Sequence, residues 1–232
     1  MKINKQNWKK YTIEFLSIFI AVISAFALNN WNDNRRDNTA ETKILSEILN
    51  GLIKDSEDVK LNVTGHQQGI KSVIYWKDVI NGKSFNTDSL AQHYYMLTRD
   101  FISLQNTSGY ETLKSRGFEL IKNDSLRSEI ISLYEFDYQT LKKLEEDYPE
   151  AQFHSSYFKQ INETITPNFI FDPKGNIIDI NLPLDISESD KKILLINLWK
   201  IYVNRTFILK MYGEVEKNIE SLKKKIRTEL NQ

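Results

Sequence analysis

The chain has 232 residues, 31 basic and 31 acidic side chains, and no cysteine. Its zero formal net charge provides no strong field to attract nucleic acid, so we expect no nucleic-acid partner. The absence of cysteine excludes disulfide frameworks, thiolate nucleophiles and cysteine-based metal sites. Glycine and proline occur only 8 and 4 times, which favours long helices over a turn-rich sandwich or barrel.

The first segment has the composition of a membrane-spanning helix. An uncharged apolar run extends from Phe15 to Leu28, and it is shorter than the ~20 residues that a span usually contains. Trp8 and Trp31 flank this run, and roughly 35 Å of helix separates them, which suits aromatic anchors at the two interfaces of one bilayer. The sequence therefore predicts a transmembrane anchor at residues 11–31.

The charges before this run predict its orientation, because lysines gather on the cytoplasmic side of a span; here they are Lys2, Lys5, Lys9 and Lys10. We expect a cytoplasmic tail at residues 1–10 and an extracytoplasmic domain at residues 32–232. In a bacterium this is a periplasmic domain held at the inner membrane. Two other interpretations stay open. The segment is also typical of a cleaved signal peptide, with a cleavage signal at Ala25-Phe26-Ala27, or of the core helix of a soluble protein.

Two features of the predicted span concern partners. Ser17, Ala21 and Ala25 recur every four residues, a spacing that lets two membrane helices approach closely, although such residues are also simply common in spans. Glu14 lies at the edge of the run. Its carboxylate either reaches the interface beside the neighbouring lysines or serves a partner or a proton path.

Beyond the span the apolar pattern predicts helices. Leu45 to Val73 follows one helical face, where Gly65 and Gly69 predict a kink or a close crossing. His66 lies on this face and is interpreted as a core histidine rather than a metal ligand. A second helix is expected from about Leu90 to Leu104.

The middle of the chain contains further helices and one non-helical section. Gly117 is expected to end a short helix, and Asn123 or Asp124 to begin a longer one that Pro149 bends or restarts. Residues 168–180 alternate around an Asp-Pro-Lys-Gly turn and predict a β-hairpin. An isolated hairpin is only marginally stable, so we expect it to lie against the helices.

The last helix has the clearest signals. Ser187 to Asp190 has the spacing of a capping box. A 3–4 repeat then predicts a coiled-coil-like seam, whose members include Leu198, Arg205, Ile208, Val215, Ile219, Leu222 and Ile226. A polar residue such as Arg205 in a seam more often fixes register, or pairs with a buried acid, than performs chemistry. The predicted fold is therefore mostly α: an N-terminal transmembrane helix, then a bundle of long helices with coiled-coil-like seams and one small β-hairpin.

Two stretches resemble a known family. Residues 14–33, with Asn29-Asn30-Trp31-Asn32 after the apolar run, and the middle segment 110–127 are similar to a Bacteroidetes family of membrane-anchored proteins of unknown function (domain-of-unknown-function family 6090). The apolar helix here lacks the glycine that is usual in that family. The resemblance covers about half of the chain, and it implies membrane topology and a helical domain but no activity.

No enzyme signature is visible. The chain has no HExxH, GxSxG, Walker A or GxGxxG pattern, and its carboxylates are spread over helix faces with lysine partners. We therefore expect no enzyme, no cofactor and no metal site. The favoured hypothesis is a membrane-anchored scaffold whose partners are the lipid bilayer and either a second copy of the chain, as a homo-oligomer, or another membrane protein. The alternatives are a ligand-sensing helical bundle and a single-span subunit of a proton-driven complex that uses Glu14.

Overall fold

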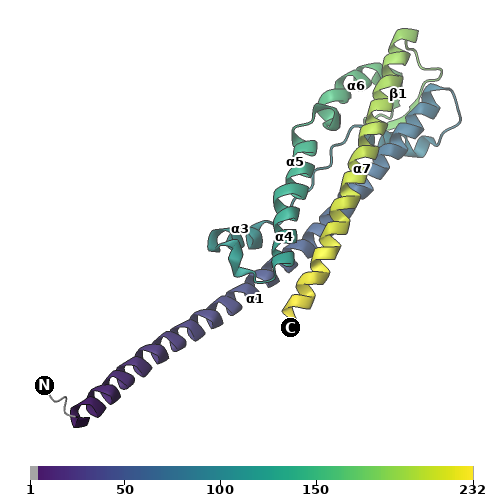
Figure 1. Cartoon of the computed structure of the whole chain (residues 1–232). Helices are drawn as coiled ribbons and strands as arrows, with labels where there is room; N and C mark the ends of the chain where they lie inside the picture. Colours follow the sequence, from purple (N-terminus) through teal and green to yellow (C-terminus); the bar gives the residue numbers. More distant parts are fainter. Residues whose placement is uncertain (1–4, 232) are drawn as a thin grey trace.

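The computed structural model describes residues 5–231, in which two long helices form the frame of the molecule (Figure 1). Helix α1 comprises Lys5–Ile80, and helix α7 comprises Glu188–Leu230. The two run antiparallel over the distal half of α1, and the proximal half of α1 extends alone as a rod. The prediction of a mostly helical chain with one small antiparallel hairpin is confirmed. Residues 1–4 of the expected N-terminal tail lie outside the described residues.

Helix α1 is unbroken, so the predicted kink at Gly65 and Gly69 is wrong. All four prolines of the chain lie outside α1 and α7, and nothing else interrupts the backbone hydrogen bonds. The two glycines serve close packing instead. A Cβ added to Gly65 would meet the ring of Phe101 at 2.3 Å, and one added to Gly69 would meet Arg205 Nε at 2.4 Å.

The second predicted helix is shorter than expected. After the single turn η1 (Thr87–Ser89), helix α2 comprises only Leu90–Leu97, and it does not continue to Leu104. Residues 98–107, which we call the strap, have no regular secondary structure. The strap crosses the bundle between α1, α5 and α7, and side chains from these helices bind its backbone.

The middle helices form a second layer over α1 and α7. Gly117 ends α3 with a φ of 99°, and Asn123 Oδ1 accepts the Leu126 amide at the start of α4, so both predicted caps are confirmed. Two five-residue π-helical turns, η3 and η5, lie in this layer. The elements are α3 (Ser108–Arg116), η2 (Phe118–Leu120), α4 (Asp124–Ser132), η3 (Leu133–Asp137), α5 (Tyr138–Glu146), η4 (Pro149–Ala151), η5 (His154–Phe158), α6 (Lys159–Ile165) and η6 (Thr166–Asn168).

The hairpin closes the end of the bundle that is farthest from the N-terminus. Strand β1 (Phe169–Phe171) pairs antiparallel with β2 (Ile177–Ile180), and Asp172 Oδ1 accepts the amides of Lys174 and Asn176 in the turn. As expected, the hairpin does not stand alone. The ring of Phe169 lies 6.1 Å from the ring of buried Trp76 of α1, which ties the hairpin to the core.

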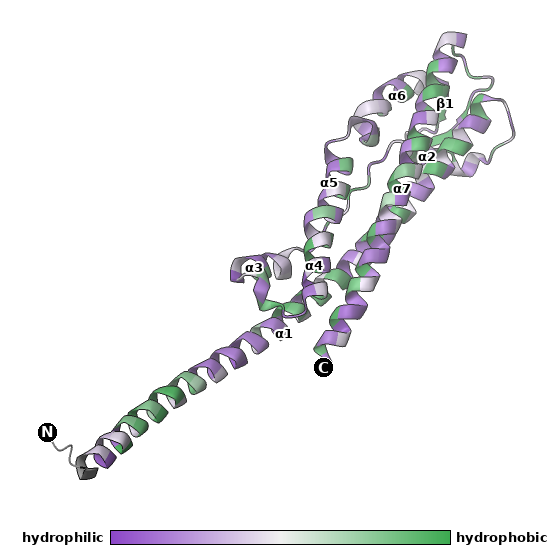
Figure 2. Ribbon diagram, viewed as in Figure 1, coloured by the Kyte–Doolittle hydropathy of each residue, from purple (hydrophilic) through white to green (hydrophobic). Residues whose placement is uncertain are grey.

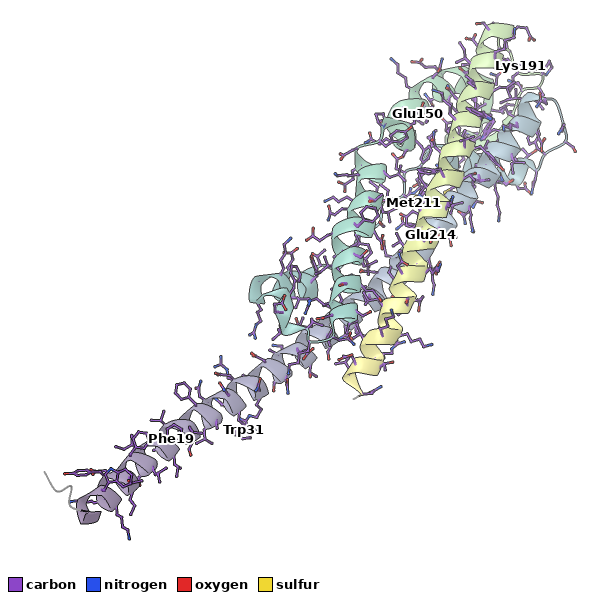
Figure 3. The ribbon with its side chains drawn as sticks, viewed as in Figure 1. Phe19, Trp31, Glu150, Lys191, Met211 and Glu214 are labelled. Atoms are coloured by element: carbon purple, nitrogen blue, oxygen red, sulfur yellow. The ribbon has the colours of Figure 1, made fainter. Side chains whose placement is uncertain are left out.

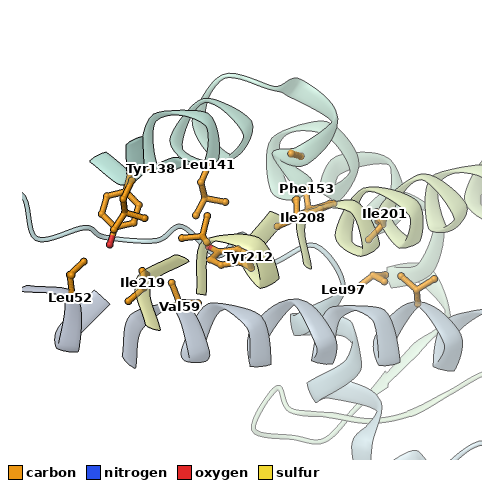
Figure 4. Close-up of a cluster of buried hydrophobic side chains, with 14 of the residues drawn as sticks. Leu52, Val59, Leu97, Tyr138, Leu141, Phe153, Ile201, Ile208, Tyr212 and Ile219 are labelled. Carbon is orange, nitrogen blue, oxygen red and sulfur yellow. The ribbon is translucent and has the colours of Figure 1, made fainter. Parts of the chain in front are cut away.

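The core is a long apolar strip between α1, α5 and α7 (Figure 4). Its ten labelled side chains, all buried, are Leu52, Val59, Leu97, Tyr138, Leu141, Phe153, Ile201, Ile208, Tyr212 and Ile219. Burying an aliphatic or aromatic side chain contributes roughly 1.5–3 kcal/mol, so α1, α7 and the segments packed on them, which include Leu97 of α2 and Phe153, stabilise one another along this strip. The core begins at Ile44, and residues 8–39 are exposed or nearly so. A chain that starts at Asp33 therefore retains every buried side chain of the domain.

Candidate functional site

The apolar segment of α1 is exposed on all sides. Trp8, Phe19 and Trp31 are 71%, 51% and 63% exposed. The apolar part of the rod is green in Figure 2, the part nearer the domain is purple, and Phe19 and Trp31 project from the helix in Figure 3. In length and composition, α1 is a helix that could cross a membrane. A helix that is apolar all round needs an apolar environment. Because no other part of residues 8–231 covers this segment, it is not a core helix of the domain.

The predicted small-residue face lies on one side of this rod. Ser17, Ala21 and Ala25 are exposed, and the Ser17 hydroxyl donates to Ile13 O at 2.8 Å within the helix. At 100° per residue, Glu14 falls on the same side. Within residues 8–231 no side chain packs on this face.

The seven seam residues of α7 lie in the interface with α1 and the second layer. None is more than 3% exposed: Leu198, Arg205, Ile208, Val215, Ile219, Leu222 and Ile226. Ser187 caps the helix, since its Oγ accepts the Asp190 amide at 3.0 Å. The seam is therefore built inside this one chain, and it does not present these side chains to a partner.

Arg205 is completely buried, and its hydrogen-bond partners are two backbone carbonyls and a histidine rather than a carboxylate. Its Nη2 donates to the carbonyls of Leu97 at 3.2 Å and Arg99 at 2.8 Å, and its Nη1 lies 3.0 Å from Nδ1 of His66. Its Cζ lies 4.0 Å from the centroid of the Phe153 ring. Burial lowers the pKa of Arg205 to about 9, so the guanidinium stays charged at neutral pH.

His66 is neutral in this setting. Burial, and then the charge of Arg205, lower the pKa of His66 to about 3. A guanidinium only donates, so Nδ1 must accept and the ring proton sits on Nε2. That Nε2 has no hydrogen-bond partner among the described residues, and aromatic rings surround the imidazole. His66 and Arg205 are 1% and 0% exposed, so we interpret the pair as structural.

Carboxylates bind the backbone of the strap, as Arg205 does at its start. They accept backbone amides that have no partner in secondary structure: Ser103 N bonds to Glu145 at 3.1 Å, Leu104 N to Asp58 at 2.9 Å and Asn106 N to Asp55 at 2.8 Å. Burial raises the pKa of Asp55 and Glu145. Side chains thus satisfy the buried backbone groups that an irregular segment would otherwise leave without partners.

A second apolar face of α7 was not predicted from the sequence. Ile196, Trp199, Val203 and Phe207 are 48%, 52%, 40% and 49% exposed and form what we call the outer stripe. At 100° per residue the stripe lies on the side of α7 opposite the seam. A second 3–4 repeat, offset from the first, was the signal that could have revealed it. Large exposed apolar side chains gathered on one helix face are typical of an interaction surface.

A cavity of about 560 Å³ opens between the end of α2, the start of the strap and η5. Tyr95 and Arg99 line one side, and His154 and Phe158 line the other. The sequence analysis did not single out these residues, because helix and strap bring them together from positions about 55 residues apart.

Among residues 8–231, no group of three or more His, Asp or Glu side chains is placed to hold a metal ion. The features that remain are surfaces and a cavity that can bind. No protein-family model matches the chain, and no match was found among curated proteins or solved structures.

Proposed function

We propose that this protein is a single-pass protein of a bacterial inner membrane, and that its periplasmic helical domain is a scaffold that self-associates through the outer stripe of α7. The observation that carries the proposal is the continuity of α1, which passes without a break from the exposed apolar segment into the buried core. From Trp31 to His66 the helix rises about 50 Å. With no loop between span and domain, the helix holds the stripe at a set height above the bilayer. The family resemblance supports this topology and adds no activity.

A second copy of the chain is the occupant that this geometry favours. Copies anchored in one bilayer by the same segment stand parallel and at the same height, so each stripe meets an identical stripe. Confinement also raises the effective concentration of the two surfaces. Trp199 and Phe207 belong to residue types that are enriched in interfaces.

The size of the stripe predicts how strong this contact is. Specific stable interfaces bury about 1,600 Å² in total, and four half-exposed side chains on one helix supply much less. We therefore expect the detached domain to be monomeric at low concentration and the anchored chain to be a dimer. This difference follows from confinement in the membrane and requires no change in the domain.

Crosslinking tests the proposal, because the natural chain contains no cysteine. Full-length Val203→Cys in native membranes should form a disulfide-linked dimer on mild oxidation, and Val203→Cys with Phe207→Glu should form much less. Leu61→Cys is the matched control, since Leu61 is 72% exposed and lies on α1 rather than on α7. Crosslinking at Leu61 but not at Val203 would place the contact on α1 and refute the stripe.

The composition of the complex tests the same proposal independently. A detergent pull-down through a C-terminal tag, followed by mass measurement, should recover the chain with copies of itself. A stoichiometric multi-span partner, with no second copy of the chain, would contradict self-association through the outer stripe and favour the proton-driven subunit that uses Glu14.

A further inference from the structure

The cavity between α2 and η5 combines aromatic walls with a cation. The guanidinium of Arg99 lies 4.8 Å from the centroid of the Tyr95 ring, and the side chain is exposed. Within the described residues no carboxylate lies at salt-bridge distance from Arg99. Its charge is thus available at the mouth of the cavity for a ligand.

The neighbouring acid, Asp100, also lines the cavity, but its carboxylate is bound by backbone amides and its negative charge is offset by Arg205 rather than paired with Arg99. Asp100 Oδ1 accepts the backbone amides of Phe153 at 2.6 Å and His154 at 3.3 Å, and Oδ2 accepts the latter at 3.3 Å. Asp100 lines the cavity beside Arg99, and its carboxylate caps the start of η5, more than 50 residues further along the chain. The buried guanidinium of Arg205 adds a second positive charge nearby, since it interacts electrostatically with Asp100.

The opposite wall is a pair of stacked rings. His154 and Phe158 are the first and last residues of the π-helical turn η5, and their rings stack with centroids 4.5 Å apart and planes 18° from parallel. A π-helical turn is rare, and such turns frequently occur at functional sites. Here the turn places two flat side chains one above the other at the edge of the cavity.

The two walls are held in place before any ligand arrives. Arg205 donates to the carbonyls of Leu97 and Arg99, which fixes the start of the strap. The hydroxyl of Tyr94, at the end of α2, bonds to Asn162 Oδ1 of α6 and ties the two sides together. A preformed site lowers the ordering cost of binding.

We infer that this cavity binds a small aromatic carboxylate, with the ring against Tyr95 and the His154–Phe158 pair and the carboxylate on Arg99. A flat ring suits walls made of flat side chains. A carboxylate suits the planar fork of a guanidinium. The volume falls within the 300–1,000 Å³ that is usual for small-molecule sites. This binding activity goes beyond the scaffold function and does not depend on it.

Titration of the ¹⁵N-labelled domain, residues 33–232, tests the inference with three probes. We expect 2-naphthoate to bind with a dissociation constant below the millimolar range and to shift the amide signals of residues 94–100 and 153–158. The neutral analogue 2-naphthalenemethanol should bind about tenfold more weakly, because it lacks the charge-assisted contact. Octanoate, which has the carboxylate but no ring, should also bind more weakly than 2-naphthoate.

Variants separate the two parts of the site. Arg99→Gln should remove the preference for 2-naphthoate over its neutral analogue, and Phe158→Ala should weaken both aromatic probes. Lys210→Gln removes an exposed charge elsewhere on the domain and should change neither affinity. The inference fails if the natural domain binds both naphthalene probes equally, if Arg99→Gln keeps the preference, or if no probe shifts these signals. None of these results depends on self-association.

Discussion

The guanidinium of Arg205 occupies the space that a side chain at position 69 would need. A Cβ built on Gly69 would lie 2.4 Å from Nε and 2.5 Å from Cζ of Arg205. The guanidinium cannot move aside, because two carbonyls, His66 and the Phe153 ring hold it. One glycine on α1 thus lets a buried charge from α7 reach the start of the strap.

This packing predicts opposite effects for two glycine-to-alanine changes. Gly69→Ala should lower the free energy of unfolding by about 1–3 kcal/mol through overpacking. Gly213→Ala, on the exposed side of α7 with nothing within 4 Å of the new Cβ, should raise it by about 0.5–1 kcal/mol. Urea unfolding of the domain measures both. Equal effects of the two changes would show that the Arg205 side chain can move away from a Cβ at position 69 at little energetic cost.

The depressed pKa of His66 predicts a loss of stability in acid. The unfolded chain binds a proton at this imidazole below about pH 6.5, whereas the folded chain does not until about pH 3. The free energy of unfolding therefore decreases as the pH falls below 6.5, and the contribution of His66 to this decrease is about 2 kcal/mol at pH 5. The measurement is the difference in unfolding free energy between the natural domain and His66→Gln as a function of pH. The carboxylates with raised pKa values, such as Asp55, occur in both chains, so their opposite pH dependence largely cancels. Parallel curves would contradict the prediction.

A charge in the seam of α7 should be far more costly than one beside it. Ile219 is fully buried, whereas Ser221, two residues further on, is exposed. Ile219→Asp should lower the unfolding free energy by at least about 3 kcal/mol, and Ser221→Asp should change it by less than about 0.5 kcal/mol. Thermal unfolding followed by circular dichroism compares the two. A similar melting temperature for both variants would mean that the seam is open to water.

Thiol labelling tests the proposed orientation. Cysteines introduced at the exposed positions Asn50 and Asn231 should react with a membrane-impermeant maleimide in intact spheroplasts, because we place the domain outside the cytoplasm. A cysteine at Lys2 should react only after lysis. The reverse pattern would invert the topology. An N-terminal sequence that starts at Leu28 would instead establish a cleaved signal peptide.

The last prediction separates assembly from proton coupling within the span. Glu14→Gln retains the shape of the side chain but cannot exchange a proton, and we expect it to preserve membrane abundance and the Val203→Cys crosslink. Removal of an interfacial carboxylate beside lysines costs at most about 1 kcal/mol. Ala21→Leu is the matched variant, because it fills the small-residue face and leaves Glu14 intact. Function is measured by whether each variant restores the normal phenotype to a strain that lacks the gene. If Ala21→Leu restores it and Glu14→Gln does not, the scaffold hypothesis is refuted.

Several elements could be predicted because their signals are local. The hairpin turn depends on Asp172 and Gly175, whose bonds span only a few residues. The caps at Gly117, Asn123 and Ser187 are likewise decided within one helical turn. The apolar run of α1 and the seam of α7 are local signals as well: unbroken apolar composition reveals the run, and helical periodicity places the seam residues on one face.

Only the tertiary structure decided where α2 ends, why α1 does not kink and which surfaces stay free. Arg205 bonds to the carbonyl of Leu97 across 108 positions, and Asp55 bonds to the amide of Asn106 across 51. These bonds replace helical ones, so local propensity could not reveal that the helix stops. A glycine such as Gly69 in a helix locally suggests a kink. Its actual role, close packing, depends on Arg205 of α7, which occupies the space where a side chain would be. The outer stripe and the cavity lie where no other segment of residues 5–231 covers an apolar face, and coverage is a property of the assembled helices rather than of any one stretch of sequence.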